Sequence, residues 1–227
     1  KFNGIFAFAI WDKRQKQIFL ARDHVGVKPL YYFWDDKRFI FSSEIKGILE
    51  HDVPRILNRE AFNHYLRVLY APEPLTMFEG IHKMPPATFV ILKDNKFSMH
   101  KYWDVVNNGS ASNVSRREVI ERIRDKVYQA VSRQLISDRP VGIYLSGGID
   151  SSVVLDNVSR IRKNIKTFSI GFDLEESEGK DKFNRDFFLA KKTAKYYGTD
   201  HHQILLSASD VVDFFESTIP NSETLLT

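Results

Sequence analysis

The sequence predicts an α/β protein in two parts, a β-rich first half and a doubly wound parallel sheet in the second half. Residues 5–103 contain short apolar runs separated by turn residues, a pattern that favours antiparallel strands. From residue 141 onward, apolar runs alternate with helical stretches, and residues 141–172 have the length of a βαβ unit. Between the halves, residues 105–114 are small and polar, which predicts a linker.

Six strands and two helices are expected in the first half. The strands cover residues 5–11, 17–21, 30–34, 38–42, 88–92 and 97–103, and the helices cover residues 43–49 and 58–69. Asn58 is the predicted N-cap of the second helix, because its side chain can accept hydrogen bonds from the first turn. The apolar side chains that would then share one face of this helix are Phe62, Tyr65, Leu66 and Leu69.

Two clusters in the first half are interpreted as structural. The charged residues Arg22, Asp23 and Lys28 lie between apolar strands and predict a salt-bridged turn. The aromatic residues 31–34 alternate along a strand, which places half of them in a core and favours packing over base stacking.

The second half is expected to begin with a capped helix. Ser115 and Glu118 have the spacing of a capping box, and apolar residues follow at helical spacing for about five turns. Beyond this helix, strands are expected over residues 141–145, 167–172 and 201–206, and helices over residues 151–162, 184–197 and 210–219. The first of these strands is predicted to be buried, and Gly198 is predicted to end the middle helix.

The strongest chemical signal is the run from Ser146 to Ser152, which joins an expected strand to an expected helix. Gly147 and Gly148 lack side chains, so backbone N–H groups can approach an anion closely. The helix start adds free N–H donors and a partial positive charge. Hydroxyl groups come from three serines, and parallel sheets bind ligands at this end of their strands. The run, which includes Ser151, therefore predicts a cradle for phosphate oxygens.

Asp150 within this run predicts a cation. A carboxylate repels phosphates unless a cation lies between them, and Mg²⁺ binds one or two carboxylates together with phosphate oxygens. The sequence has no Gly-x-x-x-x-Gly-Lys-Ser/Thr pattern, so the run is not a Walker loop. In the alternative interpretation, the run is a Ser/Gly turn in which Asp150 and Ser151 only cap a helix.

Composition narrows the classes of protein that remain. Apolar residues make up 43% and charged residues 27% of the sequence, which is typical of a globular protein. No apolar run approaches the ~20 residues that span a membrane. The formal charge of +4 comes from scattered residues, so a DNA-binding protein is weakly supported. The absence of cysteine excludes disulfides and thiolate zinc sites within the sequence, and His201 and His202 would point to opposite faces of a strand and cannot share a metal ion.

The Ser146–Ser152 run resembles the pyrophosphate-binding loop of the N-type ATP pyrophosphatases. The segments that resemble the later part of a class II glutamine amidotransferase domain are residues 6–12, 21–32, 42–46, 81–86 and 101–103. Their order is similar to that of the glutamine-hydrolysing asparagine synthetases over nearly the whole chain. The resemblance implies part of an Ntn-hydrolase (αββα) glutaminase domain over residues 1–104, the linker, and part of an adenine nucleotide alpha hydrolase-like domain over residues 115–227.

The resemblance also implies a reaction. The loop would bind the pyrophosphate of ATP with Mg²⁺ at Asp150, and backbone groups of Leu145 and Ile170 would contact the adenosine. The β-carboxylate of aspartate would attack the α-phosphate to give β-aspartyl-AMP, and glutamine-derived ammonia would then displace AMP. A cytoplasmic enzyme with small-molecule substrates is implied, without nucleic-acid or membrane partners, and a homodimer of the parent protein is one option.

The sequence departs from this family in its lack of cysteine, since the family's glutaminase nucleophile is an N-terminal cysteine. We therefore expect an internal fragment that has no glutaminase activity, with further synthetase residues following Thr227. Two alternatives stay open. One is a relative that acts on another carboxylate, such as a β-lactam synthetase, and the other is a nucleotide-binding protein without turnover.

Overall fold

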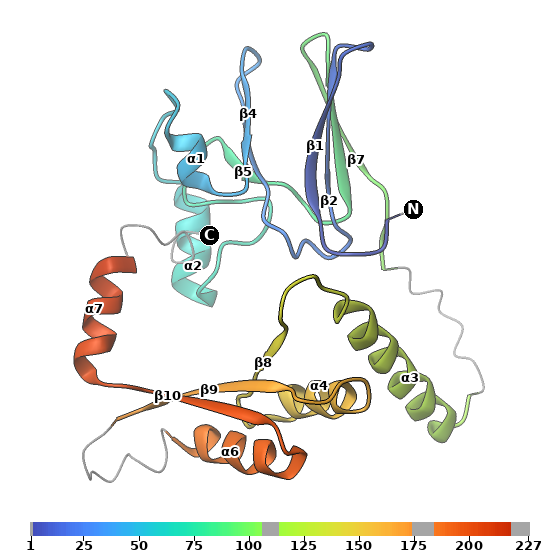
Figure 1. Ribbon diagram of the computed structural model, residues 1–227. Helices are drawn as coiled ribbons and strands as arrows, with labels where there is room; N and C mark the ends of the chain where they lie inside the picture. The colour runs from blue at the N-terminus through green and yellow to red at the C-terminus, as the bar shows by residue number, and fades with distance from the viewer. Residues whose placement is uncertain (1, 106–113, 174–183, 219–227) are drawn as a thin grey trace. The chain divides into compact units, whose positions relative to one another are not determined.

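The computed structural model of the protein describes residues 2–105, 114–173 and 184–218. The chain divides into two compact units with a boundary after residue 108, and each unit is described by itself (Figure 1). The mixed α/β composition predicted from the sequence is confirmed. Most of the predicted linker lies outside the described residues. So does the charged stretch over residues 175–182, whose sequence favours a solvated loop over a lid. Within the described ranges, no helix is long and apolar enough to cross a membrane.

The first unit contains two antiparallel sheets, with strand orders β1-β2-β6-β7 and β4-β3-β5. The strands are β1 Ala7–Asp12, β2 Gln17–Arg22, β3 Tyr31–Trp34, β4 Phe39–Ser42, β5 Ile81–Lys83, β6 Thr88–Lys93 and β7 Lys96–Lys101. Every strand predicted for this half is present, and β5 is an additional strand that the pattern did not predict. Tight turns with positive φ at Asp36, Asp94 and Asn95 close the β3–β4 and β6–β7 hairpins.

Two helices complete the first unit, α1 Ile45–Leu49 and α2 Arg59–Val68. Asn58 is the N-cap of α2 as predicted, and its side chain accepts hydrogen bonds from the N–H groups of Glu60 and Ala61 at 3.1 Å each. The apolar side chains predicted to share one face of α2 do not share a core, because Leu66 is 63% and Leu69 is 77% exposed. The helix instead buries the small side chain of Ala61.

The aromatic strand β3 divides its side chains between two cores. Tyr31 and Phe33 pack with α1 in one apolar cluster. Tyr32 points to the other cluster, where its ring stacks on that of Phe97 with the centroids 5.5 Å apart. The packing role predicted for residues 31–34 is therefore confirmed.

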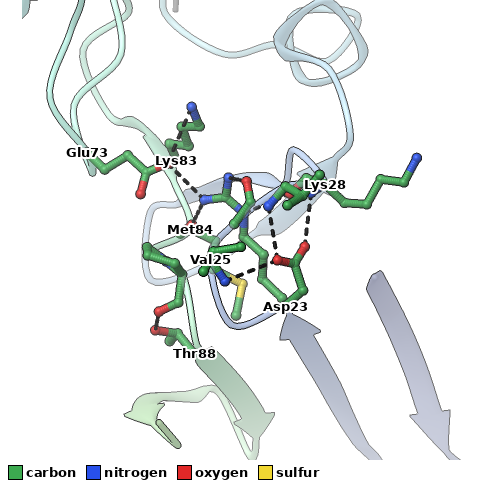
Figure 2. A network of polar contacts seen from close by, with 11 residues as sticks. Asp23, Val25, Lys28, Glu73, Lys83, Met84 and Thr88 are labelled. Atoms are coloured by element: carbon green, nitrogen blue, oxygen red, sulfur yellow. Dashed lines mark hydrogen bonds and ion pairs between the residues drawn. The ribbon is translucent and has the colours of Figure 1, made fainter. Parts of the chain in front are cut away.

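Arg22 is the centre of a buried polar network in the first unit. Figure 2 labels its partners Lys28, Glu73 and Met84. Its side chain is 1% exposed, and it donates from Nε to the carbonyl oxygen of Lys28 at 2.7 Å and from Nη2 to that of Gly26 at 2.6 Å. Its Nη1 donates to the carbonyl oxygen of Met84 and to Oε1 of Glu73, the latter at 3.0 Å. Each nitrogen of the guanidinium thus has a partner, which offsets the cost of burying a charge.

Asp23 holds the same turn, residues 22–28, from the other side. Its buried carboxylate accepts hydrogen bonds from the N–H groups of Val25 at 3.2 Å and of Val27 and Lys28 at 3.0 Å. Burial acts to raise the pKa of Asp23, but these backbone donors outweigh it and lower the pKa below the ordinary 3.8. The predicted salt bridge within this Arg22 turn is wrong, because backbone donors take the carboxylate and the Lys28 side chain points away from it (Figure 2).

The second unit contains a three-stranded parallel sheet with the order β10-β9-β8. Its elements are α3 Arg116–Gln134, β8 Gly142–Tyr144, α4 Ile149–Ser159, β9 Lys166–Phe172, α6 Arg185–Tyr197, β10 Asp200–Leu206 and α7 Ala208–Thr218. The predicted alternation of helices and parallel strands is confirmed. The core joins β8, α4 and α6, and Leu145, Leu155 and Ala190 are among its most buried members.

The other face of the parallel sheet is open in the part of the unit that the structure describes. Tyr144 is 82% exposed, Ile170 is 53% exposed and Ile204 is 48% exposed. β8 is an edge strand of three residues, so the prediction that this strand is buried holds for Ile143 and is wrong for Tyr144. The strands β8, β9 and β10 lie side by side in chain order, and parallel strands are joined by right-handed crossovers. The two connecting helices, α4 and α6, therefore lie on the same face of the sheet. Helices on both faces of the sheet remain a prediction.

Two helix ends in this unit follow the sequence signals closely. The hydroxyl of Ser115 accepts a hydrogen bond from the N–H of Glu118 at 3.2 Å, as predicted. The Glu118 carboxylate instead accepts from Arg122 at 2.6 Å, so one half of the capping box forms. Gly198 ends α6 with a φ of 62°.

Candidate functional site

The serine turn, residues 146–152, connects β8 to α4. Before it, the buried Leu145 donates its N–H to the carbonyl oxygen of Phe168 at 2.7 Å, which continues the pairing of β8 with β9. Gly147 then reverses the chain with a φ of 74°, a conformation that side chains rarely adopt. Gly148 is the N-cap of α4. The predicted passage from the carboxyl end of a strand to a helix start is therefore present.

Gly147 lies directly against the first turns of α6. A Cβ atom on Gly147 would lie 2.4 Å from the backbone oxygen of Asp186 and 2.7 Å from Cβ of Leu189. A side chain at this position would therefore have to displace α6. Both the backbone conformation and the close approach of α6 require glycine here.

The hydroxyl groups of the serine turn bond to one another and to its backbone. Ser146 Oγ and Ser151 Oγ lie 3.1 Å apart, and the N–H of Ser146 donates to Ser151 Oγ at 3.3 Å. Ser152 Oγ donates to the carbonyl oxygen of Gly148 at 2.8 Å. Since hydroxyl protons can rotate to a new acceptor, these contacts hold the turn in shape and still leave donors for an anion.

The start of α4 is uncapped, in contrast to the starts of α2 and α3. Asn58 and Ser115 supply side-chain acceptors to the first turns of α2 and α3, whereas Gly148 has no side chain to offer α4. The N–H groups and partial positive charge of such a helix start attract anions. Asp150 lies in this turn, is exposed, and forms no ion pair within the described residues. Binding of an anion at this helix start, and of a cation at Asp150, remain predictions.

The two remaining predicted site residues lie on neighbouring strands at this end of the sheet. Parallel pairing sets Tyr144 beside Phe168, so Leu145 and Ile170 lie near the same level. The side chain of Leu145 is buried in the core, which leaves its backbone for a ligand. The structure therefore brings all the predicted site residues to the carboxyl ends of β8 and β9.

Metal ligands are sparse in this region. No group of three or more His, Asp or Glu side chains in the described ranges could hold a metal ion. A single carboxylate such as that of Asp150 fits Mg²⁺, which takes most of its ligands from phosphates and water.

His201 joins β9 to β10 through its ring. Its Nδ1 lies 2.9 Å from Oγ1 of Thr167 and its Nε2 lies 3.2 Å from Oγ of Ser169. Burial, with smaller contributions from the nearby His202 and Lys191, lowers the pKa of His201 from 6.5. The ring is therefore held neutral between hydroxyl groups, which agrees with the structural role predicted for it.

Asn184, which the sequence patterns did not single out, connects α6 to β9. Its side chain is buried, Oδ1 accepts from the N–H of Phe172 at 2.9 Å, and Nδ2 donates to the carbonyl oxygen of Phe172 at 2.8 Å. Asparagine before a helix is a common N-cap signal, but this amide makes no cap bond to α6 and binds the strand instead. The sequence could therefore have marked position 184 as a helix N-cap, but it could not have predicted that the Asn184 side chain bonds to Phe172.

Comparison with sequence families divides the chain in two. A model of the glutamine amidotransferase domain matches residues 1–103, and a model of asparagine synthase matches residues 122–227. A putative glutamine-hydrolysing asparagine synthetase 2 of Methanocaldococcus jannaschii is 33% identical over 223 residues, which are 95% of this chain and 41% of that protein. A glutamine-hydrolysing asparagine synthetase 3 of Bacillus subtilis is 33% identical over 232 residues, covering 96% of this chain and 37% of that protein.

A third relative has a different name. A protein called amidase chry2 from Gibberella zeae is 32% identical over 239 residues, which cover 97% of this chain and 34% of that protein. The chain thus spans less than half the length of each of these relatives. Among solved structures, an allosteric regulatory enzyme of purine biosynthesis matches 92% of this chain and 58% of that one at 8% identity, but its TM-score of 0.24 supports no argument about the fold.

Proposed function

This chain belongs to the family of glutamine-hydrolysing asparagine synthetases, and we propose that its serine turn binds the pyrophosphate part of ATP. The observation that carries the proposal is the uncapped start of α4, which follows a strand end and two glycines and is surrounded by three serine hydroxyls. Helix starts that follow a glycine-rich turn bind phosphate oxygens through such backbone N–H groups. The alternative of a plain capping turn explains these features less well, because no side chain caps α4 within the described residues.

The proposal extends to the two parts of the chain. Residues 1–104 would contribute the later part of an Ntn-type glutaminase domain, residues 105–114 a linker, and residues 115–227 the beginning of an adenine nucleotide alpha hydrolase-like synthetase domain. The ranges matched by the two family models and the two compact units support this division. A cytoplasmic location and a homodimer of a longer protein belong to the same proposal.

In the proposed reaction, the β-carboxylate of aspartate attacks the α-phosphorus of ATP and pyrophosphate leaves. The N–H groups at the start of α4 and the serine hydroxyls would stabilise the negative charge on the leaving group. Backbone groups of Leu145 and Ile170 would contact the adenosine. Ammonia then attacks the carbonyl carbon of β-aspartyl-AMP, and AMP leaves as asparagine forms.

Mg²⁺ is proposed at Asp150. The exposed carboxylate lies in the same helix turn as the N–H groups that would hold the phosphates, so a cation between them would cancel the repulsion of like charges. When bound, Mg²⁺ would neutralise charge on the phosphate oxygens.

Calorimetric titration with pyrophosphate tests the serine turn directly. The 227-residue chain is expected to bind pyrophosphate, and Mg²⁺ is expected to tighten the binding because it bridges a carboxylate and phosphate oxygens. Asp150→Asn should remove the gain from Mg²⁺, whereas Asp156→Asn, in the same helix but bonded to Arg160 and Tyr197, should keep it. No binding by the unaltered chain would refute the turn as an anion site, and a gain that survives Asp150→Asn would refute the metal assignment.

A second candidate function is amidation of a carboxylate other than that of aspartate. The relative named an amidase supports keeping this candidate. ATP–pyrophosphate exchange by the full-length enzyme separates the two, because exchange that depends on aspartate favours the first. Exchange that does not require aspartate but depends on another carboxylic acid would favour the second candidate function.

A further inference from the structure

We propose that Asn184 is a positioning residue, which holds the start of α6 against Gly147 and thereby fixes the shape of the serine turn. The inference rests on the proposed function of that turn and adds a residue that has no place in it so far. Asn184 lies 37 positions after Gly147 in the sequence, and α6 is the element that connects them in space.

The amide of Asn184 acts as a short piece of strand. It accepts from the N–H of Phe172 and donates to the carbonyl oxygen of the same residue, at 2.9 and 2.8 Å, which is the pairing that a neighbouring strand would offer. The side chain is 3% exposed, so water does not compete for these bonds. The end of β9 and the start of α6 are therefore tied together.

The backbone of Asn184 passes this restraint to α6. Its carbonyl oxygen accepts the hydrogen bond from the N–H of Phe188 at 3.0 Å in the first turn of the helix. The same turn carries the backbone oxygen of Asp186, which would lie 2.4 Å from a Cβ on Gly147. A shift of Asn184 would move this oxygen and so change the part of α6 that contacts Gly147.

The packing beside Asn184 leaves little room for such a shift. A Cβ on Gly171 would lie 3.1 Å from Oδ1 of Asn184 and 2.8 Å from the ring of Phe187. Two glycines, Gly147 and Gly171, thus let α6 approach the ends of adjacent strands. The amide of Asn184 then fixes the distance between the start of α6 and the ends of these strands.

The test compares Asn184→Ala with Asn157→Ala in the 227-residue chain. Asn157 is a matched control, because it is also a buried asparagine of this unit but donates only within its own helix, to the carbonyl oxygen of Val153 at 2.8 Å. Both variants are expected to unfold at a lower temperature. Only Asn184→Ala is expected to weaken pyrophosphate binding, by about tenfold, the size typical of losing a support behind a binding group.

Amide NMR spectra test the positioning without any ligand. In the ligand-free chain, Asn184→Ala should shift the N–H signals of Gly147 and Gly148, and Asn157→Ala should leave them in place. If the unaltered chain binds no pyrophosphate, the proposed function fails while these signals still test the inference. Unshifted glycine signals, or equal pyrophosphate affinity in both variants, would overturn the inference.

A conservative variant adds a pH profile that loss of stability alone would not produce. Asn184→Asp keeps an acceptor for the N–H of Phe172, but an ionised carboxyl cannot donate to the carbonyl oxygen of that residue. At each pH, the pyrophosphate affinity of Asn184→Asp is divided by that of the unaltered chain. This ratio should rise toward one as the pH falls, because the introduced carboxyl then gains a proton and can donate. A ratio that does not change with pH would contradict the need for the donated bond.

Discussion

Two turns in this molecule carry backbone N–H groups that could bond to an acceptor, and they differ in whether the chain itself supplies that acceptor. In the Arg22 turn, the carboxylate of Asp23 accepts from three backbone N–H groups and is buried. In the serine turn, the N-cap of α4 is Gly148, which supplies no acceptor. The comparison teaches that backbone N–H groups serve the structure where the chain carries its own carboxylate, and mark a candidate binding site where it does not.

The two turns should therefore fail in different ways when they are altered. The Arg22 turn should lose stability, and the serine turn should lose affinity for an anion. The three tryptophans, Trp11, Trp34 and Trp103, all lie in the first unit, so tryptophan fluorescence follows the unfolding of that unit. Far-UV circular dichroism follows the helices, which are longest in the second unit.

The largest expected effect is that of Arg22→Met. This change leaves the carbonyl oxygens of Gly26, Lys28 and Met84 without their buried donor, whereas Glu73 keeps its ion pair with Lys83 at 3.3 Å. It is expected to lower the free energy of unfolding by about 3 kcal/mol or more, since each unsatisfied buried group costs about 1–3 kcal/mol. Denaturant unfolding followed by tryptophan fluorescence measures it. Arg38→Met is the control, because Arg38 is paired with Asp35 at the surface and should cost far less. Equal losses in both variants would contradict the special role of the Arg22 turn.

Gly147→Ala is expected to damage the serine turn next most severely. The left-handed backbone and the contact with α6 together should cost about 2–4 kcal/mol and weaken pyrophosphate binding. Gly198→Ala is the matched control, because Gly198 has a φ of 62° but nothing within 4 Å of its missing Cβ. It should lose stability without losing affinity, and the difference between the two variants isolates the contact with α6.

Asp23→Asn removes the negative charge from the acceptor of the Arg22 turn and replaces one of its oxygens by a donor. It is expected to cost about 1.5–3 kcal/mol at neutral pH, since hydrogen bonds to a charged acceptor are lost. The pKa of Asp23 is lower in the folded chain than its ordinary 3.8, so its stabilising effect is present above pH 3.8 and is lost as the pH falls further. The difference in unfolding free energy between the two proteins should therefore shrink below pH 3.8. A difference that stays constant with pH would contradict the pKa assignment.

Gly148→Asp tests the comparison most directly, with the smallest effect on stability. The backbone of Gly148, with a φ of −77° and a ψ of 168°, accepts a side chain, and an introduced carboxylate would cap α4. We expect a gain of about a few tenths of a kcal/mol and the loss of pyrophosphate binding, because the chain then supplies its own anion. Gly148→Ala should lose stability instead of gaining it, because alanine is a poorer N-cap than glycine, and it should keep more of the pyrophosphate binding because it brings no carboxylate. Undiminished binding in Gly148→Asp would show that the start of α4 is not the anion site.

Local sequence signals predicted much of the fold because they depend on neighbouring residues. Asn58 and Ser115 cap their helices, Gly198 ends α6, and the serine turn joins a strand to a helix. Each of these features is decided within about one turn of backbone, where residue type and hydrogen bonding are closely coupled.

Features that depend on distant partners could not be predicted in the same way. Arg22 and Asp23 are adjacent and oppositely charged, which favoured a salt bridge, but their partners are backbone groups and Glu73. Tyr144 follows the pattern of a buried strand and is exposed because β8 lies at an edge of the sheet. Asn184 has an ordinary N-cap position, yet its amide binds Phe172. For Arg22, Tyr144 and Asn184, the deciding feature is the position of another element of the fold, whereas the donors to Asp23 lie in its own turn.

The partners of Arg22 also have consequences for the order in which the first unit folds. Gly26 and Lys28 belong to the same turn, whereas Glu73 and Met84 are 51 and 62 residues away along the chain. Segments so far apart meet late, after the entropy of closing a long loop has been overcome. We expect the guanidinium to gain its last partners after the transition state. Its removal should accelerate unfolding more than it slows refolding, so this buried network sets how long the first unit stays folded once it has formed.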